Sequence, residues 1–555
     1  MIGVIADRSE HATVKEFFEL FKTPWEFYES GRSYEVLLCA GSTENLPDAA
    51  NVKLLYSSRV SDGDVEMRLG SVSQREEAIL AFRESRLPIY GKCLLFPDAG
   101  DGSALHDEAT GQPALWSGSP SHGRVIRIGY DLFREVRHLL TVGQPAKFAA
   151  IPTLELHIEL LRELIISAGV ALTEIPPIPE GYKFIVCLTH DVDHPSIRRH
   201  TWDRTVAGFL YRATLGSLRK FLARSISLRE LLINLAAAFR LPLVHLGLAK
   251  DFWRDFVRRY GDLEGDLCST YFIIPFEGRC GREAAGPAPG YRAAGYGADD
   301  IRDLIGEIRA AGGEVGLHGI DAWIDRSTGE EELKKIEQLT GATTIGSRIH
   351  WLFFSETSPA LLEQAGISYD STSGYRETVG YRAGTTQAYK PPAAERLLEL
   401  PLHAMDTALF YPAYLGLSSE KATRRLETMA DTLERFGGCL TVNWHDRSLS
   451  PERLWNKCYI RLLADLKARG AWFATAGQAV AWFRSRRAVV MGPTDAGSDS
   501  AAHHEVIDPD DIRLPGLQMR TYSGQSGTGR PESRSFVDAP LHPGSLGRIL
   551  CPTGN

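Results

Sequence analysis

The chain has 555 residues, 43% of them hydrophobic and 24% charged, and it carries a formal net charge of −8 at pH 7. This length exceeds what a single hydrophobic core supports and predicts two or three domains of a globular protein. The mild negative charge argues against nucleic-acid binding, which usually needs a basic surplus.

The sequence shows no pattern that directs a chain into or across a membrane. The first residues lack a basic segment followed by a long apolar run, which a secretory signal needs. The longest apolar stretch near mid-chain, 231–239, is far below the roughly 20 residues that span a bilayer. The eight cysteines form no CxxC pair and suit reduced thiols. We therefore expect a cytoplasmic protein.

Residues 1–175 alternate short apolar runs with polar, helix-like stretches. The apolar runs predict five strands, at 2–6, 34–40, 52–56, 88–95 and 124–129. Leu154, Ile158, Leu161 and Ile165 repeat at helical spacing and predict an amphipathic helix. This pattern indicates a small α/β domain with a mainly parallel sheet. It shows no catalytic motif, and we expect it to be noncatalytic.

A proline-rich stretch at 171–182 predicts a linker, and a second domain follows at 182–487. Eight strand-like runs recur there with helical spacers, at 183–189, 269–275, 314–318, 347–352, 367–371, 397–401, 439–444 and 471–477. Seven or eight strands separated by helices are typical of a β/α barrel. The predicted fold class is therefore α/β, with a carboxy-terminal barrel.

The barrel is interrupted by an insertion at 195–250 that contains no convincing strand. It holds ten basic and two acidic residues, interleaved with apolar ones. One interpretation is a helical excursion with a solvated basic face; the other is a peripheral contact with an anionic membrane. We favour the first. Residues 488–555 are rich in glycine and proline and predict a disordered tail.

Polar side chains stand repeatedly at the carboxyl ends of the predicted barrel strands. They are Asp191 and Asp193 after the first strand, His318, His350 and Asp370 at the third to fifth, and His403 and His445 after the sixth and seventh. In a β/α barrel these ends open onto one face, where the active site is built. The sequence therefore predicts a shared site at this face.

The segment LTHDVDHP, 188–195, carries the strongest chemical signal. Strand alternation puts Asp191 and Asp193 on the same side of the extended chain. Two close carboxylates repel each other, which favours a nearby metal ion or a shared proton. A metal with a carboxylate base would be hydrolytic machinery. The alternative is an Asp-rich loop that caps the next helix.

The THDVD run resembles the first motif of the polysaccharide deacetylase (NodB homology) family, Thr-Phe-Asp-Asp-Gly, in a divergent form. The resemblance implies that Asp191 is the catalytic base and that Asp193, shifted by one residue, binds a divalent metal such as zinc. The run GGEVGLHGIDAW, 312–323, is similar to the family motif that ends in a metal-binding histidine, which implies His318 as a ligand.

The family usually has a further ligand histidine four residues later, where this chain has Ala322. The third ligand is therefore open among Asp321, His350, His190 and an additional water, and we choose His350.

Two further runs match family motifs. SRIHW, 347–351, resembles the Arg-x-Pro motif, which implies that Arg348 orients the catalytic carboxylate. LTVNWHD, 440–446, resembles the Leu-x-His motif, which implies that His445 protonates the leaving group, with Asp446 able to orient it. The implied activity is hydrolysis of a carbon–nitrogen or ester bond: removal of an N- or O-acetyl group from a sugar or surface-polysaccharide precursor.

Two alternatives stay open. The same barrel could cleave another carbon–nitrogen bond or a glycosidic bond, and a glycosidase would need two carboxylates about 5–10 Å apart, for which Asp191 and Asp370 are candidates. Alternatively, the protein binds carbohydrate without turnover, an interpretation that the missing histidine at Ala322 supports.

Overall fold

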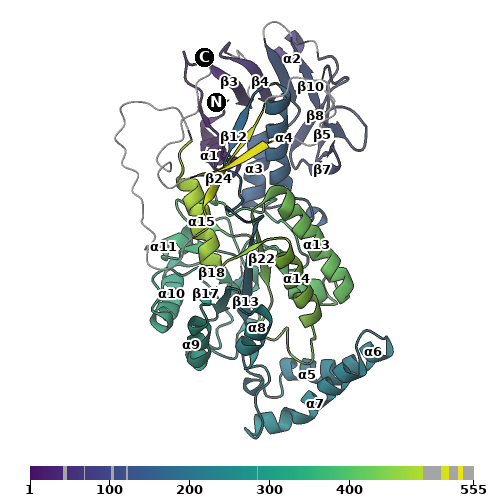
Figure 1. The fold of residues 1–555 in the computed structure, drawn as a ribbon, viewed down its shortest axis with the longest axis vertical. Helices are drawn as coiled ribbons and strands as arrows, with labels where there is room; N and C mark the ends of the chain where they lie inside the picture. The colour runs from purple at the N-terminus through teal and green to yellow at the C-terminus, as the bar shows by residue number, and fades with distance from the viewer. Residues whose placement is uncertain are drawn as a thin grey trace.

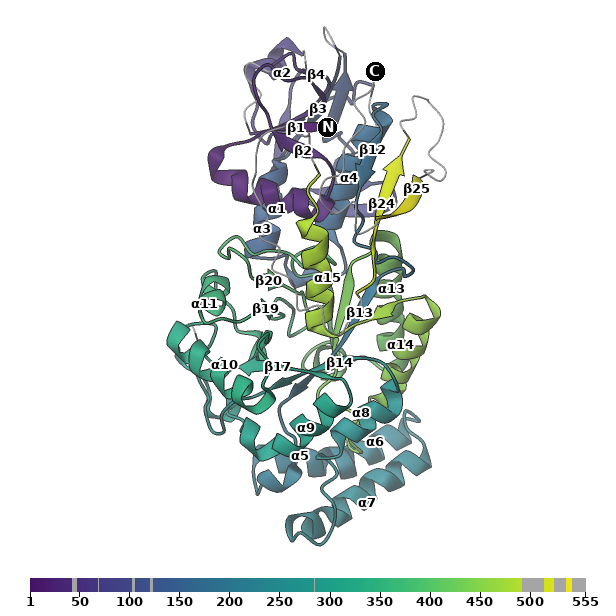
Figure 2. The same cartoon turned by 60° about the vertical axis from the view of Figure 1, so that its left-hand side comes forward.

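The computed structural model describes residues 1–41, 47–67, 69–101, 105–119, 123–283, 285–491, 514–523 and 536–541. An amino-terminal sheet lies at one end of the elongated molecule and a second, parallel sheet lies in the middle (Figure 1). Helices α5, α6 and α7 lie at the opposite end in both views (Figure 2). Each sheet has its own large hydrophobic core.

The amino-terminal sheet has the order β10-β11-β4-β3-β1-β2. Its strands are β1 (Ile2–Ile5), β2 (Trp25–Phe27), β3 (Tyr34–Ala40), β4 (Ala50–Tyr56), β10 (Leu115–Gly118) and β11 (Arg124–Ile128). All neighbours are parallel except β10 and β11. Helices α1 (His11–Phe21), α3 (Leu132–Thr141) and α4 (Thr153–Ser167) contribute apolar faces to the core. The prediction of a mainly parallel sheet is confirmed.

The strand expected at 88–95 does not join this sheet. The segment is split between β7 (Ser85–Pro88) and β8 (Lys92–Leu95), which belong to two small antiparallel sheets. Between them, the backbone amides of Tyr90 and Gly91 donate to the carboxylate of Glu135 on α3, at 2.7 and 2.8 Å. Because these amides bond to a side chain, they are not available to a continuous strand ladder.

The second sheet has the order β20-β19-β18-β17-β14-β13-β22-β21, and β23 also pairs with β13. Its strands are β13 (Ile185–Val192), β14 (Ser269–Ile273), β17 (Glu314–Gly319), β18 (Ser347–Ile349), β19 (Tyr369–Asp370), β20 (Leu398–Glu399), β21 (Ala404–Met405), β22 (Cys439–Asn443) and β23 (Trp472–Phe473). Every pairing is parallel.

Among the described residues neither β20 nor β21 has a second strand neighbour, so the sheet forms an open barrel. Each predicted strand run contains one of these strands, and the α/β barrel prediction is confirmed. β21 was not predicted from the sequence.

Helices surround the barrel and connect most of its strands. They are α8 (Phe256–Glu264), α9 (Arg302–Ala310), α10 (Arg326–Thr340), α11 (Ser358–Gln364), α12 (Asp406–Phe410), α13 (Ser419–Phe436), α14 (Asn456–Ala468) and α15 (Ala476–Ala488). All eight residues of β13 are buried, as expected for a strand that is covered on both faces.

Buried polar contacts join the two parts of the chain. Glu155 on α4 accepts hydrogen bonds from the hydroxyls of Thr385 and Thr386 and from the Thr386 amide, at 2.7–3.2 Å. Arg486 on α15 donates to the backbone carbonyls of Leu20 and Ile175. The amino-terminal part is therefore fixed to the barrel by bonds that water does not reach.

Part of the predicted disordered tail is ordered. β12 (Leu172–Glu174), within the expected linker, pairs with β24 (Leu517–Tyr522), which pairs with β25 (Phe536–Leu541). The prediction of disorder is therefore wrong for these two strands, because β12 supplies hydrogen-bond partners for β24, and β24 supplies them for β25. Residues 492–513, 524–535 and 542–555 of the tail lie outside the described residues.

The insertion folds into a helical hairpin. Its first arm contains α5 (Arg204–Tyr211), a π-helical turn (Arg212–Gly216) and α6 (Ser217–Leu222); its second arm is α7 (Leu228–His245). We call residues 196–250 the basic hairpin. A small core that includes Phe209, Leu241 and Trp253 packs its two arms together. No helix in the described part of the chain is long and apolar enough to cross a bilayer.

Candidate metal centre

Three candidate ligands come from the carboxyl ends of three barrel strands, β13, β17 and β18. Asp193 follows the last residue of β13, His318 is the penultimate residue of β17, and His350 directly follows β18. Because the strands are parallel, their carboxyl ends lie on the same face of the sheet. Trp351 and Leu352, after His350, have φ angles of 66° and 54°, so a strained turn fixes the direction of this histidine.

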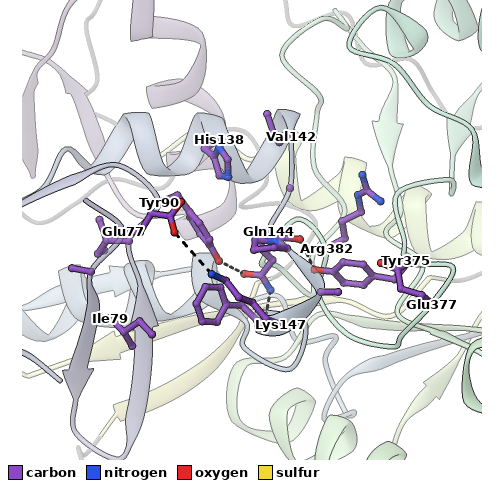
Figure 3. A pocket seen from close by; sticks show the side chains of 16 residues that line it. Glu77, Ile79, Tyr90, His138, Val142, Gln144, Lys147, Tyr375, Glu377 and Arg382 are labelled. Carbon is purple, nitrogen blue, oxygen red and sulfur yellow. Dashed lines mark hydrogen bonds and ion pairs between the residues drawn. The ribbon is translucent and has the colours of Figure 1, made fainter. Parts of the chain in front are cut away.

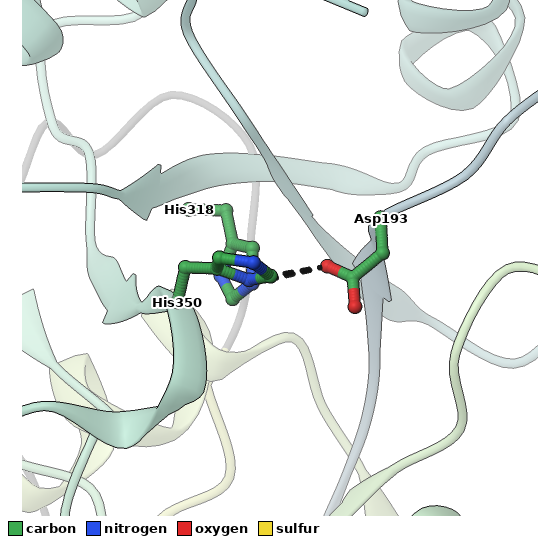
Figure 4. Close-up of side chains that lie close together, drawn as sticks. All are labelled: Asp193, His318 and His350. Carbon is green, nitrogen blue, oxygen red and sulfur yellow. Dashed lines mark hydrogen bonds and ion pairs between the residues drawn. The ribbon is translucent and has the colours of Figure 1, made fainter. Parts of the chain in front are cut away.

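The ligand atoms of Asp193, His318 and His350 all lie within 4.8 Å of one another (Figure 4). Asp193 Oδ1 is 3.4 Å from His318 Nε2 and 3.4 Å from His350 Nδ1. This buried oxygen has no hydrogen-bond partner in the structure. Burial raises the pKa of Asp193, but His350 and His318 outweigh it and hold the net pKa well below its ordinary value.

Backbone contacts fix the tautomers of both histidines. His318 Nδ1 lies 2.8 Å from the carbonyl of Arg348, and His350 Nε2 lies 3.2 Å from the carbonyl of Arg292. A carbonyl accepts only from a protonated nitrogen, so the other nitrogen of each neutral ring carries a lone pair. These two nitrogens and the Asp193 oxygen are three electron donors that face one point, which fits a divalent metal with three protein ligands.

The other candidates for the third ligand are occupied elsewhere. Asp321 accepts a hydrogen bond from the Arg282 amide at 2.8 Å. His190 points into the core, where it contacts the Trp444 carbonyl and a Glu264 carboxylate oxygen at 2.8 and 3.0 Å. The structure thus brings His350 to the site, on the strand next to the one that carries His318.

Asp191 lies beside the three ligands in a buried network. Its Oδ1 accepts from Arg348 at 2.9 Å and its Oδ2 accepts from Asn443 at 2.7 Å. His318 Nε2 is 4.0 Å from Oδ2. Burial raises the pKa of Asp191, but Arg348, His318 and His445 outweigh it and the net pKa is lowered. Asp191 is therefore an oriented anion next to the ligand cluster.

Arg348 is completely buried and makes more contacts than an ordinary ion pair. It donates to Asp191, to the Thr189 hydroxyl at 2.7 Å, and to the Ser371 carbonyl and hydroxyl at 3.0 and 2.9 Å. The planar guanidinium group is thus held in place by hydrogen bonds to three residues.

His445 follows β22 and faces the ligand cluster. Its Nε2 is 3.8 Å from Asp193 Oδ2, and its Nδ1 is 2.6 Å from Asp406 Oδ1. Burial lowers the pKa of His445, but Asp406 outweighs it and raises the pKa to about 10. The expectation that Asp446 orients His445 is wrong: Asp446 instead accepts from the His194 amide at 2.8 Å.

Two functional contacts were missed in the sequence. Asp406 begins α12 just after the unpredicted strand β21, so no pattern connected it to His445. Asn443 is the last residue of β22 and precedes His445 by two residues, and alternation along LTVNWH could have indicated that both side chains face the site.

Asp370 and His403 do not reach the site, although both follow predicted strands. Asp370 is fully buried and accepts from the hydroxyls of Ser347 and Thr372, at 2.6 and 2.8 Å. His403 Nε2 contacts the Thr385 carbonyl at 3.1 Å. Of the seven strand-end residues, five converge and these two are structural.

The site opens into a pocket of about 450 Å³. Asp191, Asp193, His318, His350 and His445 line its floor, together with four tyrosine or tryptophan and four arginine side chains: Tyr291, Trp351, Tyr411, Tyr414, Arg292, Arg376, Arg447 and Arg453. The volume and the aromatic walls suit a small organic group.

A second cavity of about 570 Å³ lies where α3 approaches the 375–382 loop of the barrel (Figure 3). In it Tyr90 donates to the Gln144 side chain and Tyr375 donates to the Gln144 carbonyl, at 2.9 and 2.7 Å. None of the predicted site residues lines this cavity. It is larger than the first, but the candidate metal ligands line the smaller one.

No family model and no curated protein matches the chain. Proteins from Mycobacterium smegmatis and Pseudomonas aeruginosa PAO1 that are assigned as polysaccharide deacetylases are among the solved structures that it resembles. Their sequence identities are 19% and 15%, and both TM-scores are 0.34. The matches cover 57% and 56% of this chain and 96% and 94% of those chains.

Puue allantoinase also matches, with 16% sequence identity and a TM-score of 0.34, over 56% of this chain and 92% of that chain. A Bacillus anthracis CE4 family pseudoenzyme matches with 11% sequence identity and a TM-score of 0.24, over 55% of this chain and 68% of that chain. Similarity at this level does not establish a common function.

Proposed function

We propose that the protein is a metal-dependent hydrolase that removes an N- or O-acetyl group from a saccharide. The observation that carries this proposal is the convergence on one pocket of three metal-type donors, an anionic carboxylate (Asp191) and a cationic imidazole (His445). Hydrolytic deacylation needs these three elements: a Lewis-acid site, a base and an acid.

Asp193, His318 and His350 would hold the metal, and two imidazoles with one carboxylate suit zinc. When bound, such a metal supplies Lewis acidity to an acyl carbonyl and to water. Asp191 would take a proton from the attacking water, while Arg348 and Asn443 keep its carboxylate anionic and oriented.

His445 would give its Nε2 proton to the nitrogen or oxygen of the departing sugar. Asp406 holds the ring from the opposite nitrogen and stabilises the protonated form. Water adds to the acyl carbon, the bond from that carbon to the sugar breaks, and the products are acetate and a free amine or hydroxyl. Every proton transfer in this scheme uses a group that faces the pocket.

The charge of the pocket favours an anionic saccharide. Four arginines line it, whereas its acids are Asp191, which is paired with Arg348, and Asp193, which belongs to the ligand cluster. Arginine suits phosphate and carboxylate recognition. A phosphorylated or carboxylated sugar precursor is therefore the substrate class to test first.

The glycosidase alternative is weakened by the position of Asp370, whose carboxylate is buried among hydroxyl donors and does not line the pocket. Without it, Asp191 has no carboxylate partner across the pocket for a two-carboxylate mechanism. A binding protein without turnover is a separate alternative, and only an activity measurement distinguishes it.

The test combines metal content with acetate release. Purified wild type is expected to hold about one divalent metal per chain and to release acetate from an N-acetylated sugar phosphate or oligosaccharide. The Asp191→Asn variant should keep the metal and lose activity at least about 100-fold. Metal binding without acetate release across such substrates would favour a carbohydrate-binding role, and unchanged activity in the variant would exclude the assignment of Asp191.

A further inference from the structure

The second arm of the basic hairpin, α7, is apolar on two faces. One face packs Ala237, Leu241 and Val244 into the hairpin core. The other face is exposed to solvent. Five of its side chains have exposed fractions of 44–83%, and with 3.6 residues per turn they fall within an arc of about 60° around the helix axis. They are Leu228, Leu232, Phe239, Leu243 and Leu246. A helix that covers one surface of a globular protein needs only the first of these faces.

The first arm repeats the pattern. Its exposed apolar side chains are spaced 4-3-4 along the helix, which puts them on one face, and their exposed fractions are 46–72%. They are Tyr211, Leu215, Leu218 and Leu222. Twelve of the 22 large, exposed hydrophobic side chains in the described structure lie between Trp202 and Leu248. Isolated exposed leucines are ordinary, but a concentration of this kind indicates a surface that another body covers.

The charge around these faces is strongly positive. The hairpin has ten basic and two acidic residues within a chain whose net charge is −8. Glu230 pairs with Lys457, and Asp203 accepts from the Val206 amide and contacts His200. Within the described ranges, Arg224, Arg229 and Arg240 have no acidic partner. The exposed apolar faces are therefore bordered by unneutralised guanidinium groups.

We propose that the basic hairpin docks on the surface of a bilayer that contains anionic phospholipid. Its apolar faces would enter the boundary between headgroups and acyl chains, and its arginines would contact lipid phosphates. A second copy of the chain fits less well, because each copy would bring the same positive face toward the other. This docking is independent of the proposed deacetylase activity.

The hairpin is adjacent to the pocket, so docking would fix the position of the pocket relative to the bilayer. It follows Asp193 closely in the chain, and the Arg204 guanidinium at its start lies 5.8 Å from the centre of the Tyr291 ring. Tyr291 lines the pocket. A bilayer under the hairpin would therefore lie on the same side of the barrel as the pocket.

Vesicle sedimentation tests the proposal with the full chain. Wild type should bind vesicles of phosphatidylcholine mixed with phosphatidylglycerol far better than vesicles of phosphatidylcholine alone, and added salt should weaken binding. The double variant Leu222→Gln/Phe239→Gln should bind at least about tenfold more weakly, because both side chains enter the interface. Arg229→Gln/Arg240→Gln should lose most of the preference for the anionic vesicles.

The matched control is Val490→Gln/Val537→Gln, which changes two side chains of similar exposure away from the hairpin, 58% and 71%. It should bind like wild type. Circular dichroism and thermal unfolding should show that each variant is folded, as expected for exposed positions. Absence of binding to anionic vesicles, or binding that the Leu222/Phe239 change leaves intact, overturns the proposal. A third outcome also overturns the proposal: wild type forms a concentration-dependent dimer, the Leu222/Phe239 change breaks this dimer, and vesicles are not bound. The exposed face would then join two copies of the chain.

Discussion

His318 Nε2 and His350 Nδ1 face each other at 3.0 Å, while the second nitrogen of each ring contacts a backbone carbonyl. Two lone pairs at this separation repel unless a metal ion or a proton lies between them. The pair is therefore the strongest geometric indication of a metal in the molecule.

The first prediction concerns this pair. Replacing His350 with alanine removes one of three ligands, and second-shell effects alone commonly cost 10–100-fold in affinity, so we expect metal affinity to fall by about 100-fold or more. Elemental analysis and competition with a chelator measure this loss. His138→Asn, in the other cavity, is the control and should keep full metal content. Unchanged affinity in His350→Ala would mean that the third ligand lies elsewhere.

The second prediction concerns Arg348. Because this guanidinium is buried against the Asp191 carboxylate, Arg348→Met should lower the free energy of unfolding by about 3–5 kcal/mol. In the Asp191→Asn background the same change should cost less, since no anion is left unpaired. Chemical denaturation of wild type, the two single variants and the double variant gives the coupling energy between Arg348 and Asp191. Equal losses in both backgrounds would show that the two groups do not act as a pair.

The third prediction is a pH profile. Asp406 raises the pKa of His445 to about 10, so the imidazole is protonated, and able to act as an acid, throughout the neutral range. Asp406→Asn removes the main cause of this increase, and the alkaline limb of the kcat profile should move to lower pH. Asp446→Asn, which changes a carboxylate bonded to the His194 amide, should move the limb far less. An alkaline limb that stays in place in Asp406→Asn would contradict the role of His445 as the acid.

The fourth prediction concerns stability in acid. His157 is fully buried in the amino-terminal core, and burial lowers its pKa from 6.5 to about 3. The unfolded chain therefore binds a proton that the folded chain does not, and stability falls as the pH drops below 6.5, with a slope of up to about 1.4 kcal/mol per pH unit.

His157→Gln keeps an acceptor for the Tyr130 hydroxyl but cannot take up the proton. Its free energy of unfolding should therefore depend less on pH between 6.5 and 4 than that of wild type. Urea denaturation at several pH values measures the difference. Parallel curves for the two proteins would show that His157 does not titrate in this way.

Local sequence patterns were sufficient for most of the barrel and for five residues of the site. Apolar runs located the longer strands, and the polar residue at the end of each run indicated Asp191, Asp193, His318, His350 and His445. Parallel pairing then brings these ends together, so local order was enough to predict a shared site.

Contacts between segments that are far apart in sequence were not predictable in this way. Asp406 reaches His445 from α12, and β24 pairs with β12, which lies far away in the sequence. Asp370 was expected at the site, but the short strand that carries it turns its carboxylate toward Ser347 and Thr372. In each case a tertiary partner decides the outcome, and a single sequence does not contain that information.

The contacts of Glu155 and Arg486 make the two parts of the chain depend on each other. If the barrel were separated at residue 182, Thr385 and Thr386 would lose the carboxylate that accepts their hydrogen bonds, and the buried Arg486 would lose the Leu20 and Ile175 carbonyls. Water would replace these partners, so each lost hydrogen bond costs about 0.5–1.5 kcal/mol, and those made by the charged groups cost more. The molecule is therefore expected to melt in one cooperative transition, with neither half stable as an independent module.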